Sequence, residues 1–313
     1  MNIQTYHYLC IIVFQQKIQQ VDFYPIPTCN LDELIGTKAA FDIRTAELFS
    51  GNIRLDLSTN AIIGVGAFKT AQSAQLTLSP LRCSGIGSSA NHNIVLKRPY
   101  VDDNYVKPSQ PPFTRYVLKD ESNLLYREAN VLYWAKALLK MTYEFIDRAV
   151  EDADAPPPFE VPRLRFVDAG LMLAYSVVTV VDADGTGQPA KPSGTVSMMY
   201  LAEEFIPISS GEDFVKYIHN GDAIPCDLFD PKADEFAEFL AFTQHVQYIK
   251  TSGQVYISDY QGTSYQPFEY PAVLITSTCR QWVAFDRPAN PHPSVGHFRL
   301  LLCLTRTHIW VIQ

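Results

Sequence analysis

The chain has 313 residues and a formal net charge of −8 at neutral pH. This length suffices for one large domain or for two lobes around a cleft, and a hydrophobic content of 47% suffices for a sizeable core. The acidic balance disfavours a protein that binds nucleic acid through a general basic surface. A local phosphate site remains compatible with it, because backbone amides and one or two cations can build one.

The six cysteines are scattered and form no CxxC pair, which favours free thiols in a reducing compartment. The apolar runs at 8–14 and 298–304 are too short to span a bilayer. Neither a positively charged region nor a small-residue cleavage site accompanies the first run. We therefore expect a soluble cytoplasmic protein without a membrane or nucleic-acid partner.

The first half of the chain predicts strands. Residues 1–50 show no clear period and are predicted to be an N-terminal extension. Beyond them, apolar and polar residues alternate or flank glycine turns, as in an antiparallel meander. The predicted strands lie within 53–57, 61–71, 75–78 and 94–100.

The second half mixes helices and strands. The spacing of apolar residues predicts a long helix over 121–152 and a second helix over about 230–248. Strand-like segments lie at 163–168, 171–181, 196–206 and 254–262. The predicted class is α+β, with a strand-rich first lobe that holds one long helix and a mixed second lobe.

The segment from Gly64 to Lys69 is a candidate phosphate loop. Gly64 and Gly66 lie between apolar strands, where they let the backbone approach a ligand, and Lys69 adds a cation. The same residues also fit a plain hairpin turn.

Lys97 lies in an otherwise apolar strand, where a buried ammonium needs a carboxylate or a phosphate. Glu128, on the apolar side of the long helix, is the expected partner. The alternative is a lysine on the solvent face of an edge strand. Arg98, on the opposite face, is expected to be solvated.

Further candidates follow later strands. Glu203 and Glu204 either contact an adenine or ribose or mark a solvated strand end. Asp259 and Gln261 follow an alternating strand and offer oxygen ligands for Mg²⁺, although an ordinary turn fits equally well. His245 by itself is most simply a structural histidine on a helix.

Taken in order, these pieces resemble the alpha-kinase family, which includes the myosin heavy-chain kinases and the elongation-factor-2 kinase, and they resemble its fungal-type branch most. The residues that carry the resemblance are IGVGAFKTAQSAQL (63–76), VLKRPY (95–100), MYLAEEFIP (199–207), FVKYIHNGD (214–222) and FLAFTQHVQYIKTSGQVYISDYQG (239–262). They extend over about two thirds of the chain. The last block is the most specific.

The resemblance implies a two-lobed protein-kinase-like fold that binds ATP and Mg²⁺ and phosphorylates serine or threonine in a protein. The expected domain spans 51–282, with a first lobe to about residue 200, and is followed by a divergent tail at 283–313. Lys97 is implied as the lysine on the ATP phosphates, and Gly64 and Gly66 as the nucleotide cover.

Three further roles are implied by the resemblance. Glu203 and Glu204 fall on the hinge that meets adenine. Asp259 is the catalytic aspartate, with Gln261 as a metal-linked neighbour. His245 matches the first ligand of a structural zinc site.

The chain departs from the family beyond residue 262. The family's Leu-Thr-Asp-Pro motif has its nearest counterpart in 274–279, which contains no acid, and the closing His-x-Cys…Cys of the zinc site is not recognisable. Three hypotheses follow. The first is an active kinase, the second is a nucleotide-binding pseudokinase that serves as an interaction module, and the third is an interaction domain in which Gly64, Lys97 and Asp259 are purely structural.

Overall fold

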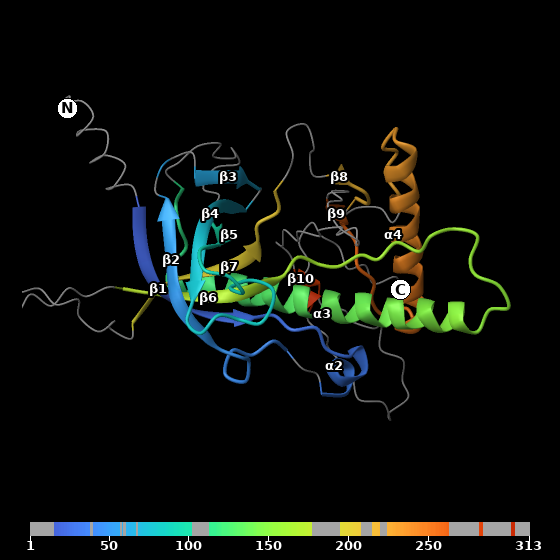
Figure 1. Ribbon diagram of the computed structural model, residues 1–313, viewed down its shortest axis with the longest axis horizontal. Coiled ribbons are helices and arrows are strands. Elements are labelled where there is room, and N and C mark those ends of the chain that lie inside the picture. Colours follow the sequence, from blue (N-terminus) through green and yellow to red (C-terminus); the bar gives the residue numbers. More distant parts are fainter. Residues whose placement is uncertain are drawn as a thin grey trace, which may run out of the picture. The chain divides into compact units, whose positions relative to one another are not determined.

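A computed structural model describes residues 16–37, 40–56, 58, 61–66, 68–101, 113–176, 195–207, 215–219, 224–262, 282–283 and 302–303 (Figure 1). The fold is mixed α+β and rich in strands, which confirms the α+β part of the predicted class. No helix among these residues combines the length and the apolar composition that crossing a membrane requires.

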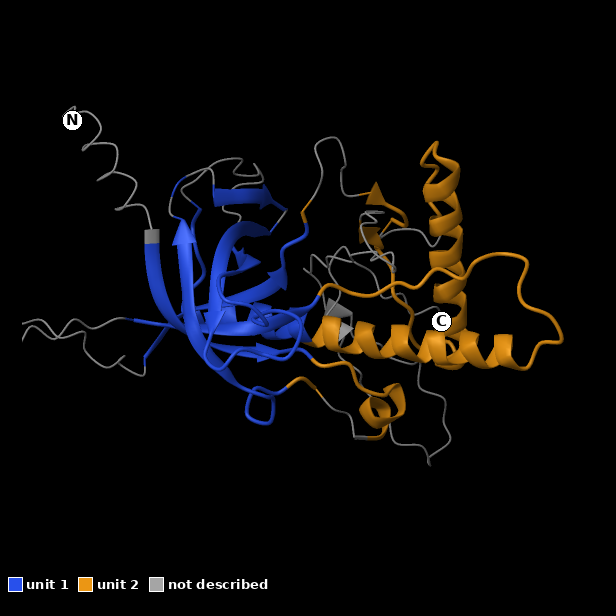
Figure 2. Cartoon of the chain, in the orientation of Figure 1, with its two compact units in different colours: residues 1–26, 42–129, 168–206 blue, residues 27–41, 130–167, 207–313 orange. Residues whose placement is uncertain are grey.

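The chain divides into two compact units (Figure 2). Unit 1 comprises residues 1–26, 42–129 and 168–206, and unit 2 comprises 27–41, 130–167 and 207–313. Each unit is therefore assembled from three separate stretches of the sequence.

Unit 1 contains a closed barrel of antiparallel strands. Its strands follow the order β2-β1-β6-β7-β5-β4, and the pairing of β2 with the second half of β4 closes the ring. β3 pairs with the first half of β4, along the same edge as β2. The strands are β1 (Gln16–Pro25), β2 (Phe49–Asp56), β3 (Ile62–Val65), β4 (Lys69–Leu78), β5 (His92–Pro99), β6 (Ala169–Tyr175) and β7 (Val196–Glu204).

Alternate residues of these strands fill the barrel. On β4, Ala74, Leu76 and Leu78 join the buried cluster inside the barrel, together with Phe23 of β1 and Ile94 of β5. The residues between them face outward, as the two-residue period of a strand requires. The predicted N-terminal extension contributes β1, which pairs with β2 on one side and with β6 on the other and so belongs to the barrel.

Gly51 lies where β2 and β4 close the barrel, opposite Leu78. A Cβ atom at Gly51 would lie 2.2 Å from the carbonyl oxygen of Thr77, which belongs to the rigid backbone of the ladder. At Gly64 of β3, by contrast, the nearest atom would be the Cβ of Ala71, at an ordinary distance of 3.8 Å.

Gly51→Ala is therefore expected to lower the free energy of unfolding by about 1–3 kcal/mol, the usual cost of overpacking. Gly64→Ala is the matched control and is expected to change it by less than about 0.5 kcal/mol. Urea unfolding followed by circular dichroism measures both. Equal stability of the two variants would contradict this account of the barrel seam.

In unit 2, helices account for the largest share of the described residues. It contains α2 (Leu31–Thr37), the part of α3 (Leu118–Glu151) from residue 130 onward, and α4 (Pro231–Lys250). Its strands are short and pair as β8 (Val215–Lys216) with β9 (Gln261–Gly262) and as β10 (Trp282–Val283) with β11 (Leu302–Cys303).

The boundaries of α4 follow from its sequence. Asp230 caps the first turn by accepting a hydrogen bond from the Lys232 amide, and Pro231 occupies the first turn, where no amide hydrogen is needed. Ser252 and Gly253 both adopt positive φ and end the helix.

Two predicted strands differ in the structure. Residues 163–168 are irregular, and of the segment 254–262 only β9 belongs to a strand.

Candidate functional site

The outer face of the barrel carries two buried ion pairs. Lys69 Nζ lies 2.5 Å from Glu128 Oε2, and both side chains are 4% exposed. Lys97 Nζ lies 2.6 Å from Glu203 Oε2, with exposed fractions of 12% and 6%. Glu128 therefore pairs with Lys69 rather than with Lys97, which differs from the sequence-based expectation.

The strand register explains why these charges gather. Ala71 of β4 lies opposite Lys97 of β5, so Lys69, two residues before Ala71, faces the same side. Glu203 of β7 lies opposite Val95, two residues from Lys97, and is its diagonal neighbour. The helix α3 supplies the remaining carboxylate, that of Glu128.

The electrostatics of the four residues, here called the charge cluster (Lys69, Lys97, Glu128 and Glu203), are coupled. Burial raises the pKa of the Glu128 carboxyl, while Lys69 and Lys97 act in the opposite direction and Glu203 adds to the increase. The cluster contains two cations and two carboxylates, which limits the cost of burying it. Lys97 is its more exposed cation and therefore the one better placed to exchange a carboxylate for a ligand's phosphate.

Glu204 is committed to the backbone. Its Oε1 accepts a hydrogen bond of 2.7 Å from the Asp168 amide, and its own amide donates to the Asp168 carbonyl at 2.9 Å. Glu204 thus ties β7 to the residue before β6. Neither Glu203 nor Glu204 marks a solvated strand end.

Gly64 and Gly66 lie in and just after β3. The Gly66 amide donates to the Lys69 carbonyl at 2.8 Å, and the Tyr100 hydroxyl donates to the Gly66 carbonyl at 2.7 Å. This hairpin turn places Lys69 at the start of β4. The ammonium group of Lys69 points toward Glu128 and donates a hydrogen bond to it within the charge cluster.

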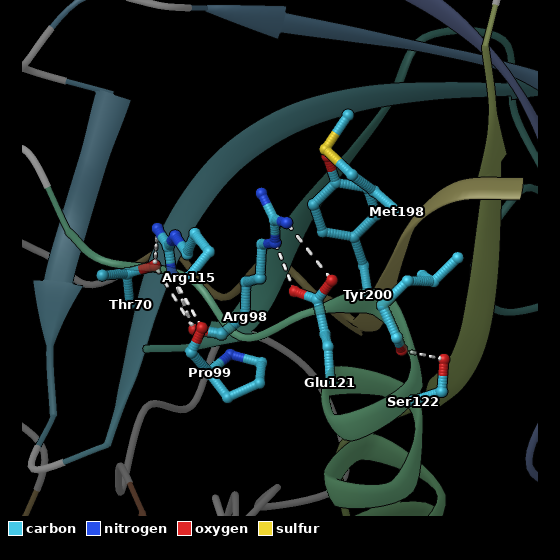
Figure 3. A network of polar contacts seen from close by, with 9 residues as sticks. Thr70, Arg98, Pro99, Arg115, Glu121, Ser122, Met198 and Tyr200 are labelled. Carbon is cyan, nitrogen blue, oxygen red and sulfur yellow. Dashed lines mark hydrogen bonds and ion pairs between the residues drawn. The ribbon is translucent and has the colours of Figure 1, made fainter. Parts of the chain in front are cut away.

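A second polar network anchors β5, the strand that carries Lys97 (Figure 3). The Arg98 guanidinium binds both carboxylate oxygens of Glu121, whose side chain is 1% exposed. Arg115 donates to the carbonyls of Arg98 and Pro99 and to the Thr70 hydroxyl. Arg98 is therefore half-buried and paired with a buried carboxylate of α3, rather than solvated as the sequence predicted.

Burial and the neighbouring Arg98 lower the pKa of Arg115 to about 10. Arg115 stays protonated at neutral pH despite this shift. Its three bonds join β4 and β5, and it fixes the position of the strand segment next to Lys97.

The candidate catalytic residues of unit 2 lie around Asp259. Asp259 is 2% exposed and has a φ of 58°, in the left-handed region that few residues other than glycine occupy. Its Oδ1 lies 2.5 Å from Lys216 Nζ. Burial raises the pKa of the Asp259 carboxyl, whereas Lys216 and, more weakly, His219 lower it.

Gln261 lies beside this pair. It forms β9 and is the direct partner of Lys216 in the register of β8 with β9. The structure thus brings Asp259, Gln261 and Lys216 together.

The donor set suits Mg²⁺, a hard cation that accepts a few protein oxygens and keeps waters and phosphates as its other ligands. Asp259 and Gln261 are the residues that would hold it. The candidate segment 274–279 lies outside the described residues.

His245 is exposed on α4. Within the described part of the chain, no group of three or more His, Cys, Asp or Glu side chains lies close enough to hold a metal ion. The described residues around His245 therefore do not fit a zinc site.

Lys216 is the site residue that the sequence reasoning missed. It lies between Val215 and Tyr217 in an apolar stretch, the pattern that pointed to Lys97. The same argument, that a lysine among apolar strand residues needs an anionic partner, could have singled it out.

No protein-family model matches the chain, and no curated protein matches it either.

Proposed function

We propose that the chain is an ATP-dependent serine/threonine protein kinase of the alpha-kinase type, with its two units corresponding to the two lobes of that fold. The proposal is supported by the motifs at 63–76, 95–100 and 239–262 and by the chemistry of the residues that they contain. Its cofactors are ATP and Mg²⁺.

The observation that carries the proposal is the combination of burial, a lysine partner and a positive φ at Asp259. A carboxylate that is buried, bound to a lysine and held at a φ of 58° requires its surroundings to stabilise an unfavourable conformation. Such backbone strain costs about 1–3 kcal/mol and is concentrated at functional sites. A turn aspartate can share the positive φ, but it is ordinarily exposed and needs no lysine partner.

In the proposed reaction, Lys97 binds the ATP phosphates, and Glu203 sets the position of its ammonium group. Asp259 orients a serine or threonine hydroxyl and accepts its proton as the hydroxyl oxygen bonds to the γ-phosphorus. The bond from the γ-phosphorus to the bridging oxygen breaks, and ADP leaves. Lys216 stabilises negative charge beside Asp259, and Mg²⁺ supplies further charge neutralisation when bound.

A second candidate function is a pseudokinase that binds nucleotide but acts as an interaction module. It is favoured by the engagement of Lys97 with Glu203 at 2.6 Å, because ATP phosphates must compete with that carboxylate.

Nucleotide-dependent thermal stabilisation tests both candidates. A ligand at 100 times its dissociation constant stabilises the native state by about 2.7 kcal/mol, so saturating Mg·ATP is expected to raise the melting temperature by several degrees. Lys97→Met is expected to remove most of this increase. Lys119→Met, at an exposed position of α3, is the control and is expected to retain it.

For each variant, the quantity compared is the rise in melting temperature when Mg·ATP is added. Lys97→Met also removes the cation that pairs with Glu203, and this lowers the melting temperature without nucleotide. No increase in the wild type would contradict the kinase and the pseudokinase together. It would favour an interaction domain whose Lys97 and Asp259 are structural.

A further inference from the structure

The inward face of α4 changes character along the helix. Most of its buried residues recur at helical spacing in one stripe, which is apolar in the first half of the helix and polar in the second, and Thr243 and Val246 are buried beside this stripe. This buried stripe consists of Ala233, Ala237, Leu240, Gln244 and Gln247, and continues to Thr251 just beyond the helix.

The polar half of the stripe hydrogen-bonds the backbone of the segment that leads to Asp259. Gln244 Nε2 donates to the Ile257 carbonyl at 2.7 Å, and the Ile257 amide donates to Gln247 Oε1 at 2.8 Å. One turn further along, the Thr251 hydroxyl accepts from the Val255 amide at 3.1 Å, and its one proton is shared between the Val255 carbonyl at 2.9 Å and the Gln247 carbonyl at 2.8 Å.

These bonds reproduce a strand pairing with side chains. Both backbone groups of Ile257 are satisfied by side chains of α4, as in a hydrogen-bonded pair of an antiparallel sheet, and Thr251 contacts both backbone groups of Val255. The spacings are similar, because the four residues from Gln247 to Thr251 rise about 6.0 Å along a helix and two strand residues rise about 6.8 Å. The extended segment therefore needs no neighbouring strand at this point.

Asp259 lies between this arrangement and a second anchor. Two residues before it, Ile257 is held by the two glutamines. One residue after it, the Tyr260 carbonyl accepts from the Tyr217 amide at 2.9 Å and from the Ile218 amide at 3.3 Å. The left-handed conformation of Asp259 is thus enforced from both sides.

We propose that Gln244 and Gln247 are positioning residues for Asp259, acting through Ile257 to aim its carboxylate at Lys216 and the reacting hydroxyl. This proposal rests on the proposed kinase function. The two side chains are 4% and 0% exposed, so solvent does not compete for their bonds. They touch neither the nucleotide nor the protein substrate in this assignment.

Gln247→Met removes the acceptor of the Ile257 amide, and Gln244→Met removes the donor to its carbonyl. Each is expected to reduce kcat for γ-phosphate transfer about 10²-fold, the effect of a small misplacement of a catalytic group. The KM for ATP is expected to stay within about threefold, because Lys97, the residue proposed to bind the ATP phosphates, is untouched by either change. The control is Val246→Ala, a core change on α4 whose residue makes no bond to Ile257 and is 4% exposed.

Gln244→Glu adds a readout that a purely structural role would not give. The introduced carboxylate repels the Ile257 carbonyl when ionised, but can donate a hydrogen bond to it when protonated. The kcat of this variant relative to wild type is therefore expected to rise as the pH falls. A ratio independent of pH would overturn the proposal.

Amide hydrogen exchange at Ile257 tests the proposal without a measurement of kinase activity. Gln247→Met is expected to speed this exchange at least tenfold, and Val246→Ala is expected to leave it unchanged relative to the rest of α4. Equal exchange rates in wild type and Gln247→Met would overturn the proposal. A wild type that transfers no phosphate would overturn the kinase assignment and, with it, the catalytic role of Gln244 and Gln247. Slow amide exchange at Ile257 in that wild type would still support the hydrogen bonds of the two glutamines to Ile257.

Discussion

Replacing Lys69 with methionine lowers the free energy of unfolding by about 3–5 kcal/mol, because it leaves the buried Glu128 carboxylate without its cation. Adding Glu128→Leu to the same chain restores most of the loss, since two apolar side chains then replace two charges. Urea unfolding of the wild type, both single variants and the double variant forms a double-mutant cycle that isolates the pair.

The control is Arg44→Met in the same unit. The Arg44 guanidinium lies 2.6 Å from Asp42, but its side chain is 85% exposed, so its removal is expected to change stability little. If the single variants of Lys69 and Glu128 were as stable as Arg44→Met, this would contradict the burial of the Lys69–Glu128 pair away from solvent. A double variant as unstable as the sum of the singles would contradict their direct pairing.

Asp259→Asn reduces kcat for phosphate transfer by about 10²–10⁴-fold, the contribution of a positioned general base. Asparagine is the appropriate replacement because it tolerates the left-handed φ of 58° and keeps the shape of the side chain. Alanine would add backbone strain to the loss of the carboxylate and confuse the two effects.

Asp259→Asn is expected to retain the thermal stabilisation by Mg·ATP that Lys97→Met loses. The two variants thereby separate transfer from binding. Loss of stabilisation in both, together with loss of native circular dichroism, would mean that both residues are structural.

The barrel strands could largely be predicted, because β2, β4 and β5 alternate between inward apolar and outward polar residues. β1 escaped prediction because its first half breaks the alternation of apolar and polar residues. Gln19 faces inward and is 2% exposed, while Ile18 is 60% exposed. The period of two is left to Val21 and Phe23, which are too few residues to predict a strand.

The partners of the candidate residues could be predicted less well than the residues themselves. The sequence indicates that Glu128 faces the sheet, but the register of β4 with β5 decides that Lys69 rather than Lys97 meets it. The pairing of Lys216 with Asp259 likewise depends on β8 and β9, which are distant in sequence. Register is a property of the folded sheet, and single-residue patterns leave it open.

The segment before Asp259 shows why an alternating pattern can predict a strand where the structure forms none. Val255 and Ile257 alternate as strand residues do, but the chain has no regular secondary structure there. Their hydrogen-bond partners are side chains of α4 and Thr251, not a strand. Glutamines on a helix carry no signal in the sequence that assigns them this role.

The kinase assignment is tested most directly by the transfer of labelled γ-phosphate from Mg·ATP to a basic serine- and threonine-containing protein and to the chain itself. The account predicts label on serine or threonine with the wild type, and almost none with Asp259→Asn at equal folded concentration. Absence of label with folded wild-type protein, or equal labelling by Asp259→Asn, would contradict it.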